Sequence, residues 1–141
     1  MKLVVDANIL VGECWRKRGR KLLQSPHLTL YIAEKVFEET CYEINRRTDI
    51  LEQQGKLTKS TKNELIFLVE DIFFNYLNFK PFSFYPHLES EARKRVPRDP
   101  NDWETVALAM AEEAAIWTQD YDFLGCGCAT WTTETILIQL T

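Results

Sequence analysis

The sequence has little of what fibrous, disordered or membrane-spanning chains require. Its 141 residues include only five glycines and five prolines, and 45% of them are hydrophobic, which excludes collagen-like, mucin-like and disordered chains. No run approaches the roughly 20 apolar residues that span a bilayer. The N-terminus carries one lysine and then Leu3 to Asp6, which does not resemble a signal peptide. We therefore expect a single domain over residues 1–141, cytoplasmic and without a membrane partner.

Cysteine and histidine are also scarce. The chain contains four cysteines and two histidines: Cys14, Cys41, Cys126, Cys128, His27 and His87. Only Cys126 and Cys128 are close in sequence, and their spacing is tighter than in a zinc knuckle. We predict four reduced, structural thiols rather than disulfides or a zinc site, in keeping with a reducing compartment.

Short apolar segments alternate with stretches of helical periodicity along the chain. Strands are predicted at Lys2–Val5, Leu28–Ile32, Ala115–Thr118 and Ala129–Trp131. Helices are predicted from Asn8 onward, at Ala33–Leu51, at Thr58–Phe79, at Asn101–Ala115 and, in preference to a strand, at Thr133–Leu140. This alternation predicts βαβ units and a parallel sheet, which places the protein in the α/β class.

Three local features refine this prediction. Gly55 separates the two long helical stretches, which we expect to form an antiparallel helical hairpin. Asn101 and Glu104 have the spacing of a capping box at the start of their helix. The basic segment around Gly19 is expected to be an exposed loop.

Acidic residues stand where the predicted strands and helices begin or end. They are Asp6, Glu39, Asp99, Asp102, Asp120 and Asp122. Sites in parallel sheets form beyond the carboxyl ends of the strands, so one cleft can collect these acids. Mg²⁺ and Mn²⁺ prefer such oxygen ligands, and two such ions would suit cleavage of a phosphodiester.

Some of these acids have an equally simple structural explanation. Asp99 and Asp122 can be ordinary turn residues, and Asn8 can cap the first helix as well as orient Asp6 or a metal-bound water. Asp6 differs, because a carboxylate that ends a buried apolar strand has no structural reason to be there.

Four motifs, in order, resemble those of the PIN-domain family. They are Asp6-Ala7-Asn8-Ile9-Leu10; Ile32-Ala33-Glu34 leading to Glu39; Arg98-Asp99-Pro100-Asn101-Asp102 with Ala107-Leu108-Ala109; and Thr118-Gln119-Asp120-Tyr121-Asp122-Phe123-Leu124. The resemblance implies a three-layer α/β/α sandwich with a central parallel sheet, here with the helical hairpin inserted. It also implies Mg²⁺- or Mn²⁺-dependent cleavage of RNA, and many small members are VapC-type toxins paired with an antitoxin.

The resemblance assigns roles residue by residue. The expected catalytic and metal-binding acids are Asp6, Glu39, Asp102 and Asp120, with Asp122 as a fifth metal ligand and with Asn8, Asp99 and Thr118 in support. Glu38 is the only rival to Glu39. Two positions depart from the family pattern: Ala33 stands where serine is frequent, and Trp103 where a small residue is usual. For Trp103 we favour packing over stacking on a base.

Partner surfaces are predicted more broadly. The formal charge of −4 does not suggest a nucleic-acid binder, but the positive charge is clustered. The proposed RNA-binding cluster is Arg16, Lys17, Arg18, Arg20 and Lys21, although solvated loop charge explains it equally well. A second cluster comprises Arg93, Lys94, Arg95 and Arg98. The helical hairpin is the expected surface for a homodimer or an antitoxin, unless its apolar stripe is plain core.

Other functions fit the residues less well. A haloacid-dehalogenase-type phosphatase needs a second Asp two residues after the first, where this chain has Asn8. A receiver domain needs an acidic pair in the first loop, which is absent. The remaining alternative is a catalytically silent PIN-like scaffold that binds RNA or protein without cutting.

Overall fold

The protein is built on a central sheet of five parallel strands. A computed structural model describes residues 1–141. The strands are β1 (Lys2–Val5), β2 (Thr29–Ala33), β3 (Leu77–Lys80), β4 (Ala115–Trp117) and β5 (Thr130–Trp131). They lie in the order β3-β2-β1-β4-β5, and all four pairings are parallel. The predicted α/β class is confirmed, and the carboxyl ends of all five strands face one edge of the sheet.

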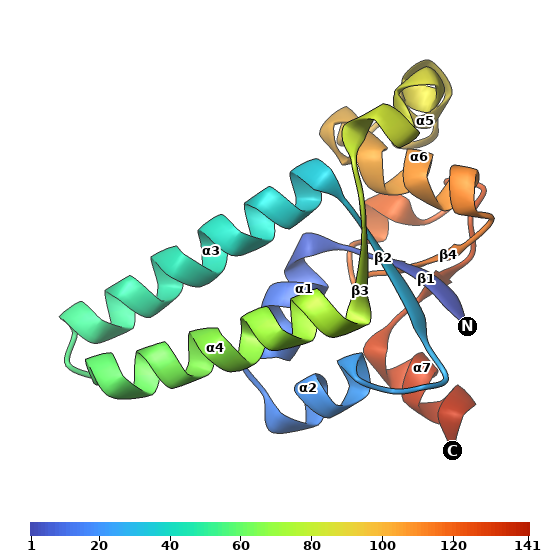
Figure 1. Cartoon of the computed structure of the whole chain (residues 1–141). Helices are drawn as coiled ribbons and strands as arrows, with labels where there is room; N and C mark the ends of the chain where they lie inside the picture. The colour runs from blue at the N-terminus through green and yellow to red at the C-terminus, as the bar shows by residue number, and fades with distance from the viewer.

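Helices cover both faces of this sheet and produce the expected three layers (Figure 1). They are α1 (Ala7–Cys14), α2 (Lys17–Leu23), α3 (Glu34–Gln53), α4 (Lys59–Tyr76), α5 (Glu89–Arg95), α6 (Trp103–Glu112) and α7 (Thr133–Leu140). α6 packs on β1, β2 and β4, with α5 beyond it, and α1, α2 and α7 lie on the other side. The three-layer arrangement predicted from the family resemblance is therefore confirmed.

The predicted helical hairpin is formed by α3 and α4. The two helices run antiparallel as an arm that extends away from the sheet (Figure 1), and Gly55 in the turn adopts a φ of 71°. Lys62 of α4 pairs with Asp49 and Glu52 of α3, which ties the two helices together near the turn. Neither these helices nor the others are long and apolar enough to cross a membrane.

Three local predictions were wrong. Leu77, Asn78 and Phe79, predicted as the end of a helix, belong to strand β3, because the backbone there pairs with β2 and the Asn78 side chain donates to the Leu30 carbonyl. The basic segment is helix α2 rather than a loop. Gly19 is buried against Glu13 of α1, so closely that a Cβ would collide with the Glu13 carbonyl. The capping box of Asn101 and Glu104 does not form.

A buried polar chain joins α1, β4 and α7. Trp117 Nε1 donates to Thr133 Oγ1 over 3.1 Å, and Thr133 Oγ1 donates to Glu13 Oε1 over 3.2 Å. All three residues are buried. This chain sets the start of α7, the closing helix that the sequence favoured, against α1.

Candidate functional site

The site begins where β1 and β4 end side by side. The Asp6 amide donates to the Trp117 carbonyl over 3.1 Å, which continues the pairing of the two strands by one residue. Thr118 Oγ1 donates to Asp6 Oδ2 over 3.0 Å and accepts from the Asp120 amide over 2.9 Å. Thr118 thus links Asp6 with Asp120, and Asp6 itself is only 9% exposed.

Two turns bring further carboxylates to the same edge. Asp120 Oδ1 accepts from the Asp122 amide over 2.9 Å and caps the short 3₁₀ turn Tyr121–Phe123. Asp99 Oδ1 accepts from the Asn101 amide over 3.2 Å and caps the turn Pro100–Asp102. The turns place one side-chain oxygen each of Asp99, Asp102 and Asp122 within 4.8 Å of one another.

A small acidic cavity of about 180 Å³ adjoins this trio. Asp6, Glu39, Asp99, Asp102 and Glu104 line it, and the α3 helix contributes Glu39 from its first turns. The neighbouring Glu38 does not line the cavity, because one residue turns a helical side chain by about 100°.

Crowding and burial act on the protonation of these acids. The pKa of Asp102 rises from 3.8 to about 7, first because the carboxyl is partly buried and then because Asp99, Asp6, Asp120 and Asp122 carry like charge. Burial likewise raises the pKa of Asp6, which the hydrogen bond from Thr118 partly offsets while Asp120 and Glu39 add to the rise. Without a counter-charge, the site disfavours its own ionised state.

The chemistry of the donors fits a hard divalent cation. Asp102 Oδ2 is buried and has no hydrogen-bond partner, which is costly for a carboxylate. All the charged groups that line the cavity are carboxylates, the ligand type of Mg²⁺ and Mn²⁺. A cation held by Asp102 with Asp99 and Asp122 would satisfy that oxygen and offset the mutual repulsion.

Glu104 is a residue that the sequence reading missed. It is 3% exposed, lines the acidic cavity, and accepts a hydrogen bond of 3.2 Å from the Tyr85 hydroxyl. Burial raises the pKa of its carboxyl, which the Tyr85 hydrogen bond partly offsets. The capping-box spacing assigned Glu104 to its own helix, and no sequence signal connects it with Tyr85, 19 residues earlier.

Five predicted positions do not line the cavity: Asp120, Asp122, Thr118, Asn8 and Trp103. Asn8 is exposed on the first turn of α1, does not line the cavity, and does not cap the helix, whose N-cap is Asp6. Trp103 is 4% exposed and packs edge-on against Tyr85 at 5.8 Å between ring centroids, with the Arg93 guanidinium 5.4 Å from its ring. These contacts agree with the favoured packing role of Trp103.

The basic helix α2 lies at the opposite end of α1 from Asp6 (Figure 1). Arg20 is committed there, since its Nη1 donates to the Cys14 carbonyl over 2.8 Å. Arg16, Lys17, Arg18 and Lys21 are exposed. RNA contact by this cluster stays a prediction, with the length of α1 between it and the acids.

Comparison with solved structures shows the same fold in distant proteins. VapBC2 from Rickettsia felis, solved with a DNA fragment from their promoter, superposes with a TM-score of 0.65 at 20% identity, over 94% of this chain and 98% of that one. PAE2754 from Pyrobaculum aerophilum superposes with a TM-score of 0.65 at 17% identity, over 99% of this chain and 89% of that one. FitAcB from Neisseria gonorrhoeae superposes with a TM-score of 0.60 at 20% identity, over 93% of this chain and 96% of that one.

Sequence comparison assigns the family. No curated protein matches the chain. The family model for the PIN domain, however, matches residues 4–141, which include every acid of the cavity. By this match, and with the parallel sheet and acid-lined edge described above, the chain belongs to the PIN-domain family.

Proposed function

We propose that this protein is an endoribonuclease that depends on Mg²⁺ or Mn²⁺ and hydrolyses RNA phosphodiester bonds. PIN domains are generally nucleases. The observation that carries the proposal is Asp102, whose Oδ2 is buried without a partner and whose pKa is raised to about 7 among other carboxylates. A scaffold that only binds RNA has no use for so unfavourable a cluster.

The proposed catalytic set is Asp6, Glu39, Asp102 and Asp120, with Asp122 as a further metal ligand. When bound, a divalent ion would lower the pKa of water and stabilise the leaving oxygen. Thr118 holds Asp6 in place through its 3.0 Å hydrogen bond and fixes the start of the Asp120 turn through the amide. Asp99 is proposed as a supporting ligand, because its carboxylate belongs to the close trio. Asn8 is proposed only as a supporting residue, because it is exposed on α1 and does not line the cavity.

Ribonuclease assays test the proposal directly. Asp6→Asn, Asp102→Asn and Asp120→Asn should each lower cleavage of an RNA substrate in Mg²⁺ or Mn²⁺ by about 100-fold or more, because each removes charge that positions the ion. Glu39→Gln should follow closely. Glu38→Gln is the matched control and should remain near the parent rate. Cleavage that persists in a chelator would contradict the metal-dependent mechanism, whereas RNA binding without any cleavage in Mg²⁺ or Mn²⁺ would favour the silent scaffold.

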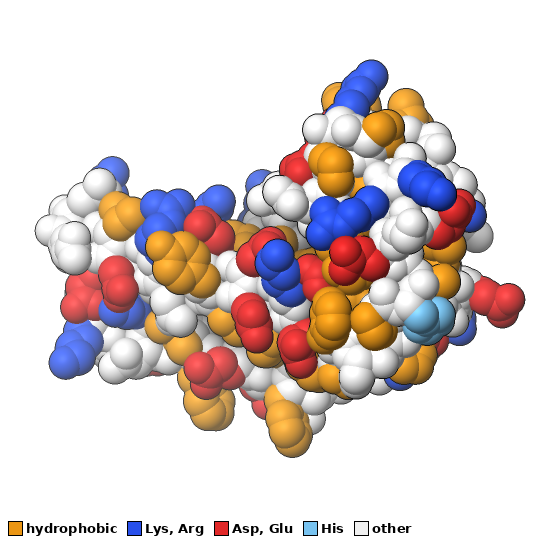
Figure 2. Space-filling model, turned by 90° about the horizontal axis from the view of Figure 1, so that it is seen from above, with side chains coloured by type: hydrophobic (Ala, Val, Ile, Leu, Met, Phe, Trp, Pro, Cys, Tyr) orange, Lys and Arg blue, Asp and Glu red, His pale blue; other side chains and the backbone are white.

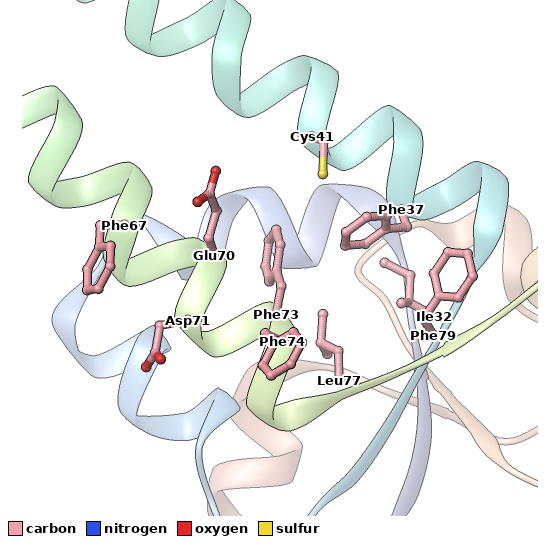
Figure 3. A pocket seen from close by; sticks show the side chains of 10 residues that line it. All are labelled: Ile32, Phe37, Cys41, Phe67, Glu70, Asp71, Phe73, Phe74, Leu77 and Phe79. Carbon is pink, nitrogen blue, oxygen red and sulfur yellow. The ribbon is translucent and has the colours of Figure 1, made fainter.

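The partner surface is proposed on the α3–α4 arm. A groove of about 680 Å³ lies where α4 meets α3 and β3. Figure 3 shows Phe37 next to Phe73 in its lining, and their rings pack edge to face at 5.8 Å between centroids. At its outer side Phe67 and Phe74 are 70% and 87% exposed. In the space-filling view of Figure 2, hydrophobic side chains stand out from the arm. Exposed aromatic side chains next to a groove are typical of a protein-binding surface.

We propose an antitoxin helix as the occupant of this groove, in line with the resemblance to VapC-type toxins. Glu70 and Asp71 stand at the groove, so a helix with an apolar face and basic flanks would fit. Phe74→Glu should abolish inhibition by the product of a short neighbouring reading frame without lowering RNA cleavage.

Light scattering of the parent and of Phe74→Glu tests the predicted homodimer. A parent protein that is monomeric at every concentration would remove that prediction.

A further inference from the structure

A second hollow lies beside the acidic cavity and has a different character. It measures about 660 Å³, and one wall is formed by the end of α5 and the loop after it, with Lys94, Arg95 and Arg98. The opposite wall is the turn after Asp120, with Tyr121 and Leu124. The hollow is therefore cationic on one side, and on the other side Tyr121 and Leu124 stand next to Asp122.

Two residues connect this hollow with the acids. Asp122 lines it and also belongs to the carboxylate trio with Asp99 and Asp102. Arg98 lines it and directly precedes Asp99. Figure 2, which looks onto the edge where the strands end, shows basic and acidic side chains next to each other to the right of the arm. A single RNA strand with one phosphate at the carboxylate trio would therefore continue into the hollow.

The cations of the hollow differ in whether they already bind partners within the protein. Arg95 is held against the wall, since its Nε donates to Glu91 over 3.3 Å and its Nη1 donates to the Cys126 carbonyl over 3.3 Å. Lys94 and Arg98 are exposed and form no ion pair in the protein. Arg93, by contrast, is used by Glu89 and Trp103 and does not line the hollow. Lys94 and Arg98 are therefore free to bind an anion.

The aromatic wall is unusually open. Tyr121 is 81% exposed, and its ring stacks on no other aromatic side chain of the protein. Leu124, one turn further, is 73% exposed. Asp120 caps the turn that carries Tyr121, which fixes the backbone at Tyr121 directly after one of the carboxylates. An aromatic face beside free cations is the usual platform for a base and phosphate of a single strand.

We propose that this hollow binds the single-stranded nucleotide adjacent to the scissile phosphate, with its base stacked on Tyr121 and its backbone phosphate held by Lys94 and Arg98. This inference rests on the proposed ribonuclease function and names the part of the substrate that the protein grips. A hollow of this size suits a small ligand such as one unstacked nucleotide and is far too small for a duplex. The same cations offset the repulsion between the substrate phosphates and the acidic cavity.

Binding and cleavage of a short single-stranded RNA test the inference. Tyr121→Ala should raise the Kd, measured by fluorescence anisotropy in Ca²⁺, on the order of 10-fold, whereas Tyr121→Phe should retain parental binding. Lys94→Gln with Arg98→Gln should reduce the slope of log K against log salt by about 0.7, the contribution of the one phosphate that the two side chains neutralise on a single strand. In cleavage assays both changes should raise KM more than they lower kcat.

Matched variants locate the effect. Lys56→Gln with Lys59→Gln removes two exposed charges at the tip of the arm and should leave affinity and salt slope at the parental values. Lys17→Gln with Arg18→Gln, on α2, should have a smaller effect than the Lys94 and Arg98 pair; a larger one overturns the inference in favour of α2. An RNA with one abasic nucleotide at the stacked position should bind the parent protein more weakly than the intact RNA does. The Tyr121→Ala variant should bind the two RNAs equally well.

The outcomes separate the two proposals. If the parent cleaves RNA and the Tyr121 and Lys94/Arg98 variants match its Kd, KM and salt slope, the hollow is not a substrate site and the ribonuclease proposal stands. If the parent binds RNA through the hollow but never cleaves it, the ribonuclease proposal fails and the binding site stands. An unchanged Mg²⁺-induced shift in Tm for each variant shows that the carboxylate site is intact.

Discussion

Asp102 is the residue whose environment is least favourable to its own charge. Its folded-state pKa of about 7 lies above the ordinary value of 3.8, so the folded protein holds a proton that the unfolded chain releases. The stability contributed by this proton is complete below about pH 4 and is lost as pH rises through 7. A divalent cation bound at the proposed site would take the place of the proton as the compensating charge.

The metal-free protein should therefore become less stable between pH 5 and pH 8, measured as Tm by calorimetry in a chelator. Asp102→Asn should flatten that decrease and raise Tm by several degrees at pH 8, because the amide keeps the shape without the charge. Glu134→Gln, an exposed carboxylate on α7, is the control and should keep the parental slope. A parental slope in Asp102→Asn would show that the other acids carry the effect.

At the scale of elements, the contact between α1, β4 and α7 depends on Thr133. Its hydroxyl serves both Trp117 and Glu13, so Thr133→Val leaves two buried polar groups unpaired. Stability should fall by about 1–3 kcal/mol, measured by urea unfolding. Thr133→Ser keeps the hydroxyl and should lose clearly less. Equal losses in the two variants would mean that the methyl group, not the hydrogen bonds, is responsible.

The elements also show where local patterns mislead. Leu77 and Phe79 continue an apolar stripe, which predicted a longer α4, yet the backbone pairs with β2 to form β3. The pairing of an edge strand depends on a partner 47 residues away in sequence, as in Leu30 with Leu77, and no window of local periodicity contains it. Similarly, Asn101 and Glu104 have capping-box spacing, but Glu104 turns inward to Tyr85.

At the scale of the whole molecule, the two halves of the chain share one site. Asp6 follows the first strand and Asp120 follows the fourth. A cation held by the acids that meet there would bind the folded state alone, because the unfolded chain does not bring these acids together. Mg²⁺ or Mn²⁺ should therefore raise Tm, with a stabilisation of about 2.7 kcal/mol at 100 times the Kd. Calorimetry with and without a chelator measures it. The shift should shrink in Asp6→Asn, and melting curves unaffected by millimolar metal would remove the cation from the proposal.

Much of the site was predictable because its acids occupy recognisable places. Asp6, Asp99, Asp102, Asp120 and Asp122 follow strands or open helices, and in a parallel sheet such positions converge on one edge. Which of them approach one another was not predictable. The close trio is Asp99, Asp102 and Asp122, whereas Asp6 and Asp120 are linked to it through Thr118 and the Asp120 turn.

The sequence by itself determined the α/β class, the helical hairpin and the set of acids at the strand ends. These follow from burial patterns and spacings that act over a few residues, as in Lys2–Val5 followed by Asp6. Only the tertiary structure decided that Leu77–Lys80 joins the sheet, that Glu104 faces the acidic cavity, and that Arg98 and Tyr121 line one hollow. Those placements bring together segments that are far apart in the chain. They depend on tertiary packing, which the spacing of neighbouring residues does not encode.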